Sequence, residues 1–165
     1  INGILVSSEV SSEVITKQPI QEVILVGTKV IPHIGSGTLR WPIGYPRNIT
    51  CRWHCYYAYG KWHEGLDMRY SNSTTGPIYA ADRGRVMESG YKSDLGYYVR
   101  INHNNGMITT YAHMRSRSWV IPGIVVNKGE QIGYIGSTGR STGPHLHFAV
   151  NVYGSYRNPC KYLGC

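Results

Sequence analysis

Two short clusters of polar side chains, far apart in the sequence, carry residue types that bind zinc. The first contains His63 and Asp67, and the second contains His145 and His147. A catalytic zinc site takes three protein ligands, drawn from His, Asp, Glu and Cys, and leaves a fourth position for water. Two histidines and one aspartate meet that count. The two clusters together therefore predict a mononuclear metal site.

The second cluster has a spacing that suits a β-strand. Alternate residues of a strand project to the same side of a sheet. We therefore expect His145 and His147 to face one cleft, while Leu146 and Phe148 face the opposite side and enter a core. An isolated H-x-H often arises by chance, so the metal site is favoured because both clusters occur in one short chain.

The first cluster begins like the helical H-E-x-x-H zinc motif but departs from it at two positions. That motif requires a second histidine four residues after the first and uses its glutamate as a base. Here position 67 is an aspartate, and Gly65 disfavours a helix. We interpret Asp67 as a metal ligand and Glu64 as a residue that does not bind the metal.

Three stretches of the chain resemble the lysostaphin-type (LytM-like) zinc endopeptidases of bacterial cell walls. They are residues 63–67 (HEGLD), 111–114 (YAHM) and 136–148 (GSTGRSTGPHLHF), and the similarity extends over about residues 41–160. The resemblance implies a mainly β fold, an antiparallel β-sheet or sandwich, with one zinc ion per chain.

The same resemblance implies roles for single residues. The zinc ligands that it implies are His63, Asp67 and His147. It implies that His113 and His145 stay off the metal and share the roles of general base, general acid and oxyanion donor, since histidine exchanges a proton near neutral pH. A buried, hydrogen-bonded histidine is the structural alternative for His113. Tyr57 is expected to donate a hydrogen bond to the reacting carbonyl.

The reaction that these roles imply is hydrolysis of a peptide bond in bacterial peptidoglycan, in the cross-bridge or the stem peptide. Zinc is a Lewis acid that lowers the pKa of bound water from about 16 towards about 7. The negative charge that develops on the carbonyl oxygen needs the metal and a hydrogen-bond donor beside it. Because all five motif positions are filled, we expect an active enzyme.

Two other classes of protein remain open at this point. One is a non-catalytic wall-binding or activator module of the same fold. The other is a carrier-type β-sandwich, because residues 126–133 (VNKGEQIG) resemble a stretch of lipoyl- and biotin-carrier domains. The first would not need every site position filled, and the second does not account for the histidines. The enzyme is the favoured interpretation.

The charge of the chain indicates an anionic partner. Its 165 residues include 17 Lys and Arg against 9 Asp and Glu, a formal net charge of +8. A basic surface suits a polyanion. The basic residues are dispersed and form no nucleic-acid motif, so we expect anionic wall polymers or surface glycans beside the peptidoglycan peptides, and no nucleic acid. No apolar run is long enough to span a membrane. We expect a monomeric, secreted or wall-associated bacterial protein, cut from a longer exported one.

The four cysteines form two local groups, Cys51 with Cys55 and Cys160 with Cys165. Four cysteines allow three disulfide connectivities, and the sequence does not choose among them. A structural zinc site made by all four is the competing interpretation. An even number of cysteines fits export to an oxidising place.

The chain divides into three predicted parts. Residues 1–32 resemble part of the wall-associated G-five module, or form a simple β arm. Residues 33–40 are a Gly- and Ser-containing linker, which we expect to be flexible. Residues 41–165 are the zinc peptidase domain.

Short strands are predicted along the catalytic part, at residues 77–80, 84–88, 97–103 and 107–113. Asn105-Gly106 is a two-residue hairpin signal between the last two. We expect His103 to lie at the surface. Three loops are expected to form the walls of the cleft, at residues 43–62, 89–96 and 114–124.

Overall fold

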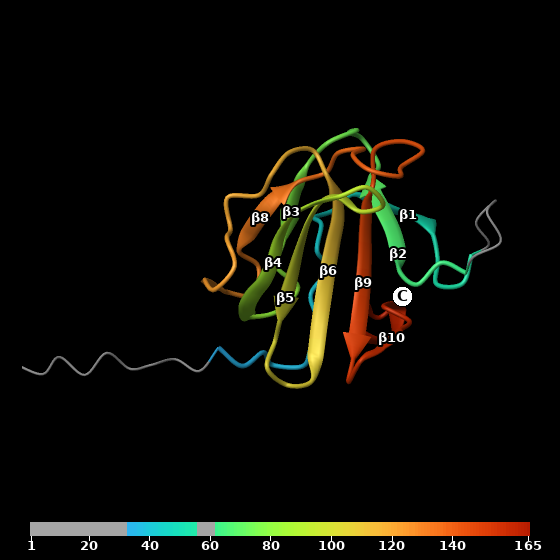
Figure 1. Cartoon of the computed structure of the whole chain (residues 1–165). Coiled ribbons are helices and arrows are strands. Elements are labelled where there is room, and N and C mark those ends of the chain that lie inside the picture. Colours follow the sequence, from blue (N-terminus) through green and yellow to red (C-terminus); the bar gives the residue numbers. More distant parts are fainter. Residues whose placement is uncertain (1–32, 56–61) are drawn as a thin grey trace, which may run out of the picture. The chain divides into compact units, whose positions relative to one another are not determined.

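The computed structural model describes residues 33–55 and 62–165, which fold around a large antiparallel β-sheet (Figure 1). The predicted N-terminal module and Tyr57 lie outside the described residues. The strands are β1 Arg47–Cys51, β2 Leu66–Tyr70, β3 Pro77–Tyr79, β4 Gly84–Lys92, β5 Gly96–Asn102, β6 Met107–Met114, β7 Val125–Val126, β8 Gln131–Tyr134, β9 Leu146–Val152 and β10 Ser155–Arg157, and α1 is Cys160–Leu163.

The order of strands in the main sheet is β1-β2-β9-β6-β5-β4-β7, with β10 paired to β9, and β3 and β8 form a second small sheet. Every strand pair is antiparallel. The mainly β, antiparallel fold predicted from the sequence is therefore confirmed. The order also places β2, β9 and β6 side by side, so three stretches that are distant in the sequence become neighbours.

The alternation of side chains separates a core face from an open face in these central strands. Leu146 and Phe148 are fully buried, and the Phe148 ring lies 5.3 Å from the ring of Tyr111 on β6. Burial of one large apolar side chain stabilises a fold by about 1.5–3 kcal/mol. The core face thus holds β6 and β9 in register, and the open face is left for polar side chains.

An irregularity in β6 changes which way its last residues point. Tyr97 pairs with Met114 and Val99 with Tyr111, so two residues of β6 face the single residue between Tyr97 and Val99. His113 lies in this bulge and has φ 59°. A bulge turns side chains away from the regular alternation. As a result His113 leaves the core side, and Met114 after it is fully buried.

The segment predicted as a linker makes several contacts with the domain. The N–H of Gly35 donates to the carbonyl of His103 at 2.7 Å, and the hydroxyl of Ser36 donates to the Asp82 carboxylate at 3.0 Å. Leu39 belongs to the hydrophobic core. Residues 35–40 are therefore in contact with the folded domain.

The prediction that His103 lies at the surface is wrong. The side chain is fully buried, its Nδ1–H donates to the carbonyl of Arg83 at 2.8 Å, and its Nε2 lies 2.8 Å from the Thr109 hydroxyl. Burial lowers its pKa.

The adjoining hairpin also differs from the expected two-residue turn. The N–H of His103 bonds the carbonyl of Met107, which leaves a three-residue loop at 104–106.

The cysteines pair locally. Cys51 is bonded to Cys55 at the end of β1, and Cys160 is bonded to Cys165 around α1. Both cross-paired connectivities and a four-cysteine zinc site are thereby excluded in this structure.

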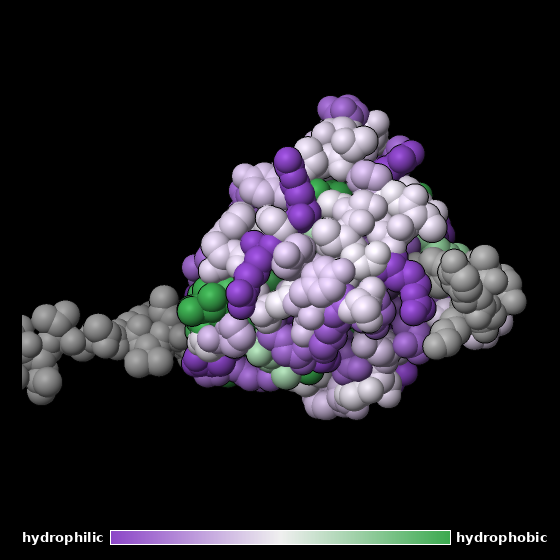
Figure 2. Space-filling view, turned by 45° about the horizontal axis from the view of Figure 1, so that its top comes forward, coloured by the Kyte–Doolittle hydropathy of each residue, from purple (hydrophilic) through white to green (hydrophobic). Residues whose placement is uncertain are grey.

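The described part of the chain holds no helix that is both long enough and apolar enough to cross a bilayer. The face drawn in Figure 2 is mostly hydrophilic or weakly polar, with hydrophobic side chains in small separate patches.

Candidate metal centre and active site

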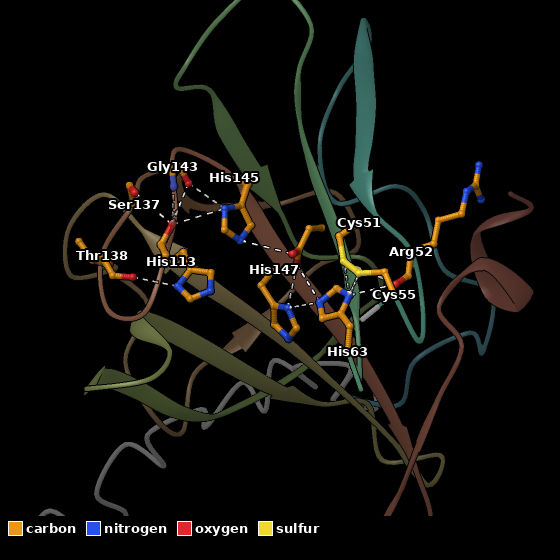
Figure 3. Close-up of polar contacts among 12 residues, drawn as sticks. Cys51, Arg52, Cys55, His63, His113, Ser137, Thr138, Gly143, His145 and His147 are labelled. Atoms are coloured by element: carbon orange, nitrogen blue, oxygen red, sulfur yellow. Dashed lines mark hydrogen bonds and ion pairs between the residues drawn. A yellow bond between two sulfur atoms is a disulfide. The ribbon is translucent and has the colours of Figure 1, made fainter. Parts of the chain in front are cut away.

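Three side chains converge at the open face of the sheet (Figure 3). Nε2 of His63 lies 3.0 Å from Oδ1 of Asp67 and 2.9 Å from Nδ1 of His147, and the last two atoms are 2.9 Å apart. Ligand atoms of a tetrahedral zinc site are separated by about 3.3 Å when each bond is about 2.0–2.1 Å. The triangle needs to open by only a few tenths of an ångström to fit that ion.

The strands bring this triangle together. Asp67 on β2 pairs directly with His147 on β9, and direct partners in a sheet share a face. His63 lies just before β2 and is buried. Gly65 allows the close approach of this turn to β9, because a Cβ there would overlap the His147 ring and lie 3.0 Å from the carbonyl oxygen of Phe148. The close packing of β9 thus explains why a glycine occupies position 65 of the HEGLD motif.

The electrostatics of Asp67 suit a cation. Burial alone raises the pKa of its carboxyl, but the adjacent imidazoles of His147 and His63 outweigh burial, and the pKa is held well below its ordinary value. The carboxylate is therefore charged over the whole physiological range. One anionic oxygen and two imidazole nitrogens form the donor set of many catalytic zinc sites.

A backbone carbonyl determines which nitrogen of His63 faces the triangle. Nδ1 of His63 lies 3.1 Å from the carbonyl oxygen of Arg52. A carbonyl only accepts, so Nδ1 carries the proton and Nε2 presents its lone pair to the other two donors. The sulfurs of Cys51 and Cys55 lie on the same outer side of the ring, 3.2 and 3.6 Å from Nδ1.

His113 and His145 lie beside the triangle with the same arrangement of protons. Nδ1–H of His113 donates to the carbonyl of Thr138 at 2.8 Å, and Nδ1–H of His145 donates to that of Gly143 at 2.8 Å. The centroids of the two rings are 4.8 Å apart. When either imidazole is neutral, Nε2 is therefore its acceptor nitrogen. Nε2 of His145 lies 3.6 Å from Oδ2 of Asp67.

The two histidines differ in how the protein shields them. His113 is almost fully buried, and burial lowers its pKa to about 4, although the hydrogen bond to Thr138 opposes this change. His113 is consequently a neutral imidazole at neutral pH, with an acceptor nitrogen available. His145 and His147 are partly exposed to the cleft.

The five motif residues share one cleft of about 270 Å³, which continues into a second hollow of about 340 Å³. The other residues that line these two hollows are Trp62, Glu64, Lys92, Asp94, Leu95, Arg100, Thr110, Arg140, Ser141, Thr142, Ala149 and Tyr156. Two of the predicted wall loops contribute lining residues. The third, residues 114–124, contributes none, and residues 140–142 take that place. The GSTG run before them is the sequence signal that would have identified this wall.

Comparisons with known proteins found similar sequences and similar solved structures. Residues 61–159 match the family profile described as "Peptidase family M23". The chain is 44% identical over 99 residues to peptidoglycan DD-endopeptidase ShyC of Vibrio cholerae, a match that covers 60% of this chain and 22% of that protein. The chain spans about a quarter or less of the length of the curated relatives ShyC and Mpg of Neisseria meningitidis.

Two solved structures share the fold. One is described as a zinc-containing peptidase from Vibrio cholerae, with TM-score 0.66, 29% identity, and coverage of 73% of this chain and 39% of that one. The other is the catalytic domain of the antimicrobial peptidase lysostaphin from Staphylococcus simulans, with TM-score 0.64, 28% identity, and coverage of 72% and 92%.

Proposed function

Because the chain belongs to peptidase family M23, we propose that it is a zinc-dependent endopeptidase that hydrolyses peptide bonds in bacterial peptidoglycan. The observation that carries this proposal is the triangle of donor atoms from His63, Asp67 and His147, with two further histidines in the same cleft. The similarity to the DD-endopeptidase ShyC makes a cross-link between D-amino acids the first bond to test.

The proposed metal ligands are His63, Asp67 and His147, with one zinc ion per chain. The two neutral imidazoles and one carboxylate leave a net positive charge on a divalent ion. When bound, zinc supplies Lewis acidity towards water and the scissile carbonyl. The similarity to a zinc-containing peptidase from Vibrio cholerae supports zinc over other divalent metals.

His113 and His145 are proposed to move the protons of the reaction. Each presents an unprotonated Nε2 when neutral, so each is able to accept a proton from water and return it to the leaving amine. The carbonyls of Thr138 and Gly143 hold both rings in the orientation that this exchange needs. Tyr57 remains the proposed donor to the carbonyl oxygen of the substrate.

The walls of the cleft suit a peptide that carries charges of both signs. Asp94 and Arg140 line the first hollow, and Lys92 and Arg100 line the second. The net charge of +8 supports attraction to anionic wall polymers or surface glycans. We propose that the protein is exported and acts at the bacterial wall.

The test combines metal content with product release. Purified protein is expected to hold one zinc per chain and to release new amino groups from purified peptidoglycan, with the new termini identified by mass spectrometry. His147→Ala should lose the zinc, whereas His113→Ala should keep it and lose turnover. His33→Ala, a histidine outside the cleft, is the matched control and should keep both.

Three results count against the proposal. Full zinc occupancy in a His63→Ala/His147→Ala double variant would contradict the ligand assignment. Normal turnover in His113→Ala would remove that residue from the reaction. Binding to walls without release of amino groups would instead favour a non-catalytic wall-binding module of the same fold.

A further inference from the structure

The Cys51–Cys55 disulfide lies against the outer nitrogen of His63 (Figure 3). The Cys51 sulfur is 3.2 Å and the Cys55 sulfur 3.6 Å from Nδ1. The disulfide closes a small loop, and Arg52, whose carbonyl accepts the Nδ1 proton, is inside it. The groups that fix the ring of a proposed zinc ligand therefore belong to one disulfide-closed loop.

The same loop also holds the backbone of this histidine. The N–H of His54 donates to the carbonyl of His63 at 2.9 Å, and the N–H of His63 donates to the carbonyl of Cys55 at 3.2 Å. The carbonyl of Arg52 accepts a second hydrogen bond, from the N–H of Cys55 at 3.0 Å. Loop 51–55 thus constrains the position, the orientation and the proton of His63 together.

We infer that the Cys51–Cys55 disulfide is a positioning element for His63, so that the affinity of the protein for zinc depends on this bond. The inference rests on the proposed role of His63 as a zinc ligand. Groups that bond the outer nitrogen of a metal-binding histidine fix its tautomer and its ring, and their loss costs about 10- to 100-fold in metal affinity. Loss of the disulfide frees loop 51–55 to carry the Arg52 carbonyl away.

Thermodynamic linkage makes the dependence reciprocal. If the disulfide strengthens zinc binding, zinc must stabilise the disulfide by the same factor. Reduction breaks the S–S bond and forms two thiols, with two electrons and two protons supplied by an external thiol that becomes oxidised. For this two-electron couple a tenfold effect on zinc affinity lowers the midpoint potential by about 30 mV. The inference therefore requires that loss of the constraint on His63 outweigh any zinc binding by the two thiols that reduction releases beside Nδ1 of His63.

The first experiment measures the zinc dissociation constant by competition with a chromogenic chelator. Cys51→Ser/Cys55→Ser is expected to bind zinc at least about tenfold more weakly than the unaltered protein. Serines are used because free thiols would add two zinc donors beside His63. Thermal melting of the metal-free variant shows separately whether the fold is retained.

Two control variants come from the same region. Cys160→Ser/Cys165→Ser removes the other short disulfide, which touches loop 51–55 through a 3.7 Å contact between the Cys160 sulfur and the Arg52 guanidinium. Arg52→Ala removes that side chain and keeps its carbonyl. Both should bind zinc within about twofold of the unaltered protein. A folded Cys51→Ser/Cys55→Ser protein with unchanged zinc affinity overturns the inference.

A second measurement applies if that variant does not fold. In the Cys160→Ser/Cys165→Ser protein, which retains only Cys51–Cys55, the midpoint potential is measured in glutathione buffers with and without saturating zinc. The potential should fall by about 30 mV or more, and no change or a rise refutes the linkage. If the unaltered protein binds no zinc at all, the proposed function itself is wrong. This outcome differs from failure of the inference alone, in which the unaltered protein binds zinc but its affinity does not depend on the disulfide.

Discussion

The buried imidazole of His113 gives a prediction about the zinc-free protein. Its pKa is lowered to about 4 from an ordinary value of 6.5, chiefly because burial disfavours the charged ring. Between these values the unfolded chain binds more protons at this residue than the folded chain does. Stability therefore falls as the pH drops through 6.5 towards 4. The difference between the two pKa values corresponds to a loss of about 3 kcal/mol by pH 4.

The assay is urea unfolding of metal-free protein over a series of pH values from 7.5 to 4. His113→Gln removes the titrating ring and keeps a side-chain amide that can donate to the Thr138 carbonyl. Over this range the unaltered protein should lose about 3 kcal/mol more stability than the variant. His33→Gln makes the same chemical change outside the cleft and should follow the unaltered protein.

Parallel curves for the unaltered protein and His113→Gln would refute the reasoning. They would mean that the folded protein accommodates the charged imidazolium at no cost, and that His113 is not held neutral by burial. The assignment of His113 as a proton acceptor at neutral pH would then lose its physical basis. A steeper fall in the variant would contradict the sign of the linkage.

Three further predictions follow from the site and the core. Gly65→Ala should weaken zinc binding by at least about tenfold, because the added Cβ would overlap the His147 ring. Gly90→Ala is the control and should bind zinc normally, because a Cβ at that position meets open space. Equal zinc affinities of the two variants in calorimetric titrations would contradict this prediction. Tyr111→Phe should cost about 1–3 kcal/mol in urea unfolding, since a buried backbone N–H and a threonine hydroxyl lose their partner, and a cost near zero would refute it. Removal of zinc by a chelator should abolish peptidoglycan cleavage and lower the unfolding free energy by about 2.7 kcal/mol relative to zinc at 100 times its dissociation constant; activity that persists without metal would exclude a catalytic zinc.

The residue types of the site could be predicted from sequence, but their meeting point could not. Alternation along one strand places His145 and His147 on the same side and sends Phe148 into the core, and this needs only local geometry. That Asp67 lies opposite His147 depends on β2 pairing with β9, a contact between segments far apart in the chain. The resemblance to a known family supplied that pairing, whereas the spacing of the residues did not.

Two placements that local sequence patterns could not predict have the same physical origin. Alternation would place His113 on the core side with Tyr111, and a bulge opposite β5 turns it outward. His103 was expected at the surface, yet a carbonyl and a hydroxyl from other segments satisfy both of its nitrogens and allow full burial. Both outcomes depend on tertiary hydrogen bonds, which no local pattern encodes.

Backbone carbonyls hold the outer nitrogens of three histidines in the cleft, and this determines which substitutions can disturb the site. The carbonyls that fix the outer nitrogens of His63, His113 and His145 are those of Arg52, Thr138 and Gly143. Substitution of a side chain does not delete a backbone carbonyl, so the protonation pattern of the site is insensitive to most changes in the residues that supply it. It is sensitive to anything that moves their backbone. Of the three carbonyls, that of Arg52 alone lies within a disulfide-closed loop. The redox state of Cys51 and Cys55 should therefore affect the position of His63, but not the positions of His113 and His145.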